Sequence, residues 1–163
     1  IFYIIWPVFI YLVAKQFFSI GLIVALSTLI STLSLLYIGK KSDKEDKYKI
    51  LKGGAILNSL SWFLRPLVFS PFGIFLAHAF TQVSQGLINI PMISLIYDQS
   101  SKGSVMKTVA FFEMSLVIGK LIAMFVIYLF LLIYPDSFVP AFILAGLMAL
   151  LYNFVTKLKE FKE

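Results

Sequence analysis

The chain has 163 residues, of which 60% are hydrophobic and only 13% are charged, and its formal net charge is +6. Soluble domains carry roughly 45–50% apolar and about 25% charged residues, so this composition excludes a water-soluble fold. With no cysteine and one histidine, the sequence also excludes disulfides, thiolate metal sites and clusters with metal-ligand spacing.

Continuous apolar runs divided by short polar stretches predict an all-α, polytopic membrane helix bundle of about six transmembrane helices. The strands of a membrane barrel would instead alternate in polarity over about ten residues. The first run reaches only roughly 20 Å, short of the roughly 30 Å hydrocarbon core, so we expect residues 1–163 to form a single bundle that is a fragment of a longer protein. The expected helices are residues 1–13, 17–39, 50–70, 72–97, 108–134 and 139–156.

The 14 basic residues divide unevenly between the two sides of this bundle. One side has only Lys15 and Arg65, and Lys120 falls inside the membrane. Because cytoplasmic loops are enriched in Lys and Arg, the basic side is expected to face the cytosol, together with the C-terminus. We therefore expect an integral protein of the plasma, or inner, membrane, and we attribute the positive charge to topology and not to nucleic-acid binding. The basic side collects Lys40, Lys41, Lys44, Lys47, Lys49, Lys52, Lys102, Lys107, Lys157, Lys159 and Lys162.

The fourth expected helix carries one polar stripe, formed by His78, Gln82, Gln85 and Asn89. At 100° per residue these four positions share an arc of about 60°. A polar stripe facing lipid would be costly, so it should face other helices or water. We favour a solvated substrate cavity, and the alternative is hydrogen bonding between helices, with a neutral and satisfied His78.

Two other helices carry small or polar residues at similar spacing, and for these we favour packing seams, because small residues let helices approach closely. Arg65 ends one of these rows and precedes Pro66. It could carry a coupling or structural charge, or it could extend its guanidinium to the outer interface. The rows are Gly54, Asn58, Ser61 and Arg65 in the third helix, and Ser27, Ser31 and Ser34 in the second.

The fifth expected helix contains two charged residues, Glu113 and Lys120, about 10 Å apart on one face. They are too distant to pair well, and an ionised group near the bilayer centre costs about 2.5 kcal/mol or more. Lys120 could bind an anionic solute or take part in proton coupling in a central cavity, or it could form a structural ion pair. For Glu113, near the interface, we favour a structural role.

Enzyme chemistry has little support in this sequence. No glycine-rich phosphate loop or nucleophile elbow occurs, and no cofactor is expected. A proton relay between His78 and Glu113, as in an intramembrane enzyme, is conceivable, but spacing alone does not bring these residues together.

The polar segment between the second and third helices contains Gly39, Asp43, Lys44 and Lys47. In these four residues it resembles the signature loop of the major facilitator superfamily, although Asp46 stands where a second glycine is usual in that family. Its position also fits, because charge counting places this loop on the cytoplasmic side. Asp43 and Lys44 could form charge pairs that latch one conformation, and the alternative is an ordinary solvated turn whose lysines only set the topology.

The resemblance implies a twelve-helix transporter of which this chain is one half, and we expect the C-terminal half. It also implies a secondary active transporter, or permease, that moves a small polar or anionic solute by alternating access, with the other half as partner and a coupling ion such as a proton. His78, Gln82, Gln85, Asn89 and Lys120 would then line the path. The alternative is a transport-inactive membrane scaffold or sensor built on the same bundle.

Overall fold

The computed structural model describes residues 5–42, 46–101, 103–134 and 137–154, and these ranges contain helices and no strand. The helices follow one another along the chain with short connections. Their bounds are α1 Ile5–Ala14, α2 Phe17–Ser42, α3 Lys47–Leu64, η1 Arg65–Leu67, α4 Pro71–Ser100, α5 Val105–Ile133 and α6 Val139–Leu150.

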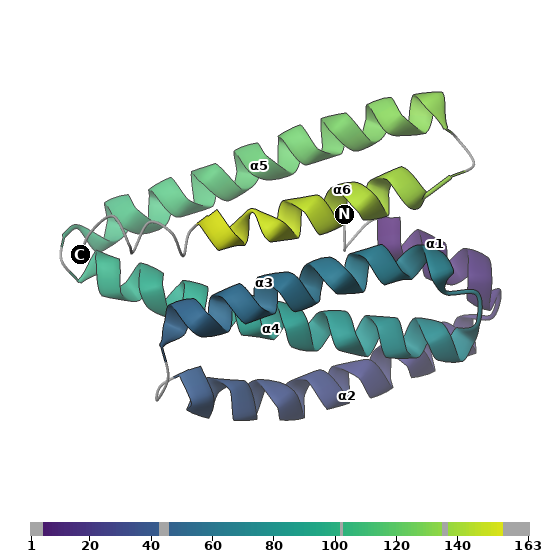
Figure 1. Ribbon diagram of the computed structural model, residues 1–163, viewed down its shortest axis with the longest axis horizontal. Helices are drawn as coiled ribbons and strands as arrows, with labels where there is room; N and C mark the ends of the chain where they lie inside the picture. Colours follow the sequence, from purple (N-terminus) through teal and green to yellow (C-terminus); the bar gives the residue numbers. More distant parts are fainter. Residues whose placement is uncertain (1–4, 43–45, 102, 135–136, 155–163) are drawn as a thin grey trace.

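The helices run up and down through one elongated bundle (Figure 1). The α2–α3 and α4–α5 connections lie at one end, on the left of Figure 1, and the connections after α1, α3 and α5 lie at the other. Lys40 and Lys47 belong to the left end, where the sequence predicts the cytoplasm, and Arg65 belongs to the right end. We call these the basic end and the opposite end.

The polar segment after the second expected helix is more helical than the predicted 40–49 loop. Helix α2 continues to Ser42, and α3 begins at Lys47, so only three residues separate Ser42 from the cap residue Asp46. The Asp46 carboxylate accepts a hydrogen bond from the Tyr48 backbone N–H at 3.0 Å, which satisfies one of the free amides of the first turn. A helix needs apolar residues only where it crosses hydrocarbon, so polar residues can continue it beyond the membrane.

Helix α4 lies at the centre of the bundle and packs extensively against α2 and α3. The two helices α3 and α4 approach closely at Gly54, where an added Cβ atom would lie 2.7 Å from Leu87 Cβ. Near this point Ser84 Oγ lies 3.3 Å from Asn58 Oδ1. Small and hydrogen-bonding residues at such contacts are typical of helix pairs in membranes.

The apolar core lies towards the opposite end. Trp6 and Ile10 of α1, Trp62 of α3 and Phe142 of α6 are buried there, and the Trp6 and Phe142 rings meet edge to face with centroids 6.2 Å apart. The core therefore ties the short helix α1 to α3, α4 and α6.

Helix α5 is more exposed than the other helices of the bundle. Of its residues, all of which the structure describes, only Ile127 is buried. Two of the described helices, Phe18–Lys40 and Val105–Ile133, are long and apolar enough to cross a membrane, and Val139–Phe154 is apolar but shorter. The exposed apolar surface of α5 requires lipid or a partner.

The Gly54 contact can be tested with two adjacent substitutions. We expect Gly54→Ala to lower the stability by about 1–3 kcal/mol, because the new methyl group would overlap Leu87. Gly53→Ala is the matched control, since a Cβ there meets no atom within 4 Å and alanine favours a helix. Thermal unfolding of the purified protein in detergent measures both. Equal effects of the two substitutions would contradict the close approach.

Candidate functional site

The polar stripe of α4 changes from buried to exposed along its length. His78 is buried, Gln82 and Gln85 are partly buried, and Asn89 is exposed. At about 100° per residue the centre of the stripe is turned by roughly 170° from Leu87, which packs against α3. The stripe therefore lies on the face of α4 that points away from the α3 contact at Leu87.

His78 forms the covered end of the stripe. The Trp6 indole N–H donates a hydrogen bond to His78 Nδ1 at 2.8 Å, and the two ring planes are nearly parallel, at 15°, with centroids 6.4 Å apart. The Gln82 side-chain nitrogen Nε2 lies 3.2 Å from His78 Nε2. A neutral imidazole that accepts at Nδ1 carries its proton on Nε2, and an amide nitrogen does not accept hydrogen bonds, so in this tautomer the bond forms when the Gln82 amide is turned to place its oxygen next to the ring. The histidine is thus held by α1 on one side and by its own helix on the other.

Arg65 is fully buried beside this group. Its guanidinium lies between two indole rings, with Cζ 3.9 Å from the centroid of Trp6 and 3.5 Å from that of Trp62. Its Nη2 donates a hydrogen bond to Thr81 Oγ1 at 3.0 Å. Arg65 therefore does not extend to the outer interface, because stacking on two desolvated aromatic rings favours an inward cation.

The rest of the third-helix row forms contacts with α4. The Thr81 hydroxyl donates to the Ala77 carbonyl at 2.7 Å, so it accepts from Arg65 and also from Ser61, whose hydroxyl is in hydrogen-bond contact. With Asn58 facing Ser84, the row from Gly54 to Arg65 makes up the α3–α4 interface. These side chains serve packing between the two helices.

The serine row of α2 satisfies its hydroxyl groups within its own helix. Ser27 donates to the Ile23 carbonyl, Ser31 to the Thr28 carbonyl at 2.8 Å, and Ser34 to the Ile30 carbonyl at 2.8 Å. Ser27 and Ser31 are buried. A hydroxyl that bonds back to its own helix presents little polarity to a neighbouring helix, which agrees with a packing seam.

Lys120 and Glu113 are both exposed on α5. Within the described part of the chain, neither makes a salt bridge. Lys120 lies about 22 Å along α5 from its first residue, near the middle of the helix. The structural ion pair that was one alternative for Lys120 is therefore not formed between described residues of this chain.

The signature-like loop contributes one observed charge pair. Lys47 Nζ lies 2.7 Å from Asp98 Oδ2 and links the start of α3 to the last turns of α4. Gly39 is partly buried near the end of α2, and an added Cβ there meets no atom within 4 Å. Asp43 and Lys44 lie outside the described residues.

Three residues important to this arrangement carried no predicted role: Trp6, Thr81 and Asp98. Asp98 could have been singled out as an acidic residue at the end of an apolar run on the lysine-rich side. Trp6 and Thr81 carry no such signal, because their importance depends on partners in other helices. Among the described residues, no three histidine or acidic side chains come together as metal ligands.

Comparison with known protein families found a match to a family model described as Major Facilitator Superfamily, over residues 1–160. Comparisons with curated proteins and with solved structures found no match. The family match covers almost the whole chain.

The hydrogen bond between Trp6 and His78, at the buried end of the polar stripe, can be tested by substitution. We expect Trp6→Phe to lower the stability by about 1–3 kcal/mol, because Nδ1 loses its indole donor while an aromatic ring stays over Arg65. The free energies of unfolding in detergent of Trp6→Phe, His78→Phe and the double variant, compared with the unchanged protein, give the interaction free energy between the two side chains. Strictly additive effects would contradict the hydrogen bond.

Proposed function

The chain belongs to the major facilitator superfamily, and from that premise we propose that it forms one half of a secondary active transporter, a permease for a small polar or anionic solute. The superfamily consists of membrane transporters and not, in general, of enzymes, so the chain is an integral membrane protein. In the proposed mechanism the two halves move against each other around a central site and expose it alternately to each side. The driving force is a solute or ion gradient.

The observation that carries this proposal is the uncovered part of the polar stripe. Gln82, Gln85 and Asn89 become more exposed along α4, on the side away from the Leu87 contact with α3. Amides facing hydrocarbon lack hydrogen-bond partners, and each unsatisfied polar group costs several kcal/mol there. A water-filled path between the two halves of the transporter removes that cost. The three amides would then offer donors and acceptors to a polar solute.

Lys120 would supply the positive charge of this path. Its ammonium group has no acidic partner among the described residues and lies near the middle of a mostly apolar helix. Facing lipid it would be strongly unfavourable, whereas facing a hydrated cavity it remains solvated. A cation in such a place favours an anionic solute or a coupled proton. Glu113, about two turns nearer the basic end, would face the same side of α5.

Closure at either end of the path would be made with the other half, while contacts at both ends of this bundle hold its own helices together. At the opposite end, the buried group of Trp6, Trp62, Arg65 and His78 packs α1 against α3 and α4. At the basic end, the pair of Lys47 and Asp98 joins α3 to α4. An exposed pair contributes only about 0.2–1 kcal/mol, so a conformational change can break it at low cost. In the proposed topology this end, with the C-terminus, faces the cytosol across the plasma or inner membrane.

A transport-inactive scaffold or sensor is the second candidate, and one observation favours it. His78, expected in the cavity, is buried and hydrogen-bonded to Trp6, and the α2 serines bond within their own helix. If the amides beyond His78 were covered in the same way by the missing half, every polar group would serve packing.

Single cysteines distinguish the two candidates, because the natural sequence contains none. Cysteines at Gln82, Gln85 and Asn89 of the full-length transporter are expected to react with a membrane-impermeant thiol reagent. A cysteine at the exposed α3 residue Leu60 should stay unreacted, since a thiol surrounded by lipid does not ionise. Uniform protection at the three amide positions would support the scaffold.

The role of Lys120 can be tested by transport. We expect Lys120→Ala to lower uptake about ten-fold or more, because a hydrogen bond to a charged group contributes about 1.5–3 kcal/mol. Uptake of a panel of small anionic and polar solutes by cells expressing the full-length transporter measures this effect. Lys120→Arg, which keeps the charge, should retain part of the activity. Loss of membrane insertion or of folded protein in Lys120→Ala would point to a structural role.

A further inference from the structure

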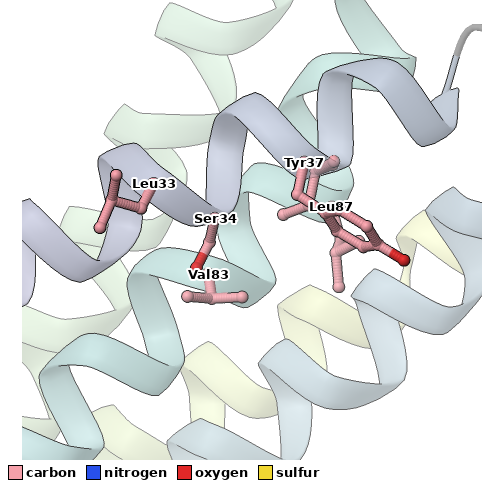
Figure 2. A pocket seen from close by; sticks show the side chains of 6 residues that line it. Leu33, Ser34, Tyr37, Val83 and Leu87 are labelled. Atoms are coloured by element: carbon pink, nitrogen blue, oxygen red, sulfur yellow. The ribbon is translucent and has the colours of Figure 1, made fainter.

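An apolar groove of about 480 Å³ lies between α2 and α4. Figure 2 shows Leu33, Ser34 and Tyr37 on one helix over Val83 and Leu87 on the other, and Ile38 completes the lining. The only polar side chain besides the Tyr37 phenol is Ser34, whose hydroxyl already bonds to the Ile30 carbonyl. The groove therefore offers a ligand apolar contact along its length.

The groove is separate from the proposed solute path. At about 100° per residue, Val83 and Leu87 are turned by roughly 130–170° from the centre of the polar stripe. Leu87 also packs against Gly54 of α3, so the groove lies on the part of the α4 surface that faces α2 and adjoins the α3 contact. An occupant of the groove would touch none of the stripe residues.

Polarity along this side of α2 increases towards the basic end. Leu33, Tyr37 and Lys40 are spaced at i, i+4 and i+7, so they lie on one face of the helix. The Tyr37 side chain is 69% exposed, and Lys40 is exposed one turn further on. The order is thus an apolar wall, a phenolic hydroxyl and an ammonium group. A phospholipid presents matching groups in the same order: an acyl chain, the ester region and a phosphate.

We propose that this groove binds one acyl chain of an anionic phospholipid from the leaflet at the basic end, with the lipid phosphate between Lys40 and the Tyr37 hydroxyl. Charge complementarity selects this occupant, because the basic end carries the lysines and the cytoplasmic leaflet is negatively charged. The groove volume lies within the roughly 300–1,000 Å³ of small-molecule sites.

The test uses the full-length protein in mild detergent, with phosphatidylglycerol and phosphatidylcholine of identical acyl chains. Native mass spectrometry measures how much of each lipid stays bound. We expect phosphatidylglycerol to be retained at least about five-fold more strongly, because one basic residue near an anionic group contributes a factor of about five.

Two pairs of variants locate the site. Leu33→Trp fills the groove and should abolish the preference, whereas Leu36→Trp, at a residue of similar exposure outside the lining, should leave it unchanged; these leucines are 62% and 65% exposed. Lys40→Gln should weaken phosphatidylglycerol retention about five-fold. Lys107→Gln, on α5, should have no effect. The lysine pair tests the site even if Leu33→Trp does not fold.

Equal retention of the two lipids would overturn the proposal, as would equal effects of a variant and its control. Displacement by glycerol phosphate alone would show a site for free phosphate and not for a lipid. A copurifying polypeptide that keeps lipid out of the groove would also reject the proposal. None of these lipid-binding results depends on transport. If the proposed transport function were wrong, the cysteine and uptake measurements would show it separately.

Discussion

The close approach of α3 to α4 is the constraint on which the rest of the bundle depends. Gly54 lets the two backbones meet at Leu87, and the pairs Ser61 with Thr81 and Asn58 with Ser84 continue the contact. In a bilayer the hydrophobic effect does not drive helices together, so short side chains and hydrogen bonds must hold this interface. With α3 on one side and α2 beside it, α4 keeps only one face free for polar side chains.

This division gives α4 two unlike environments. Its stripe of amides would border water in the assembled transporter, while Val83 and Leu87 line the groove proposed for lipid. At the opposite end, the Arg65 guanidinium is enclosed by Trp6 and Trp62 and bonds to α4 through Thr81. A buried cation held by three helices resists the separation of any one of them.

The all-α membrane bundle and the family were predicted from apolar runs and a loop motif, and the family match confirms both. Helical periodicity also predicted which four α4 residues share a face, since that geometry is local. It could not predict that Trp6 covers His78, because the two lie 72 positions apart and no local pattern links them. For Arg65, the neighbouring Pro66 and the helix end fitted an inward or an outward guanidinium equally well. Only the tertiary enclosure by two tryptophans decides between them.

The short link between α2 and α3 has a mechanical consequence. Only three residues separate Ser42 from Asp46, whose carboxylate caps α3, and Lys47 is bonded in turn to Asp98 of α4. Four residue steps span at most roughly 14 Å when fully extended, so the end of α2 cannot move farther than that from the cap of α3. Any larger displacement of the two helices from each other would have to occur at their far ends.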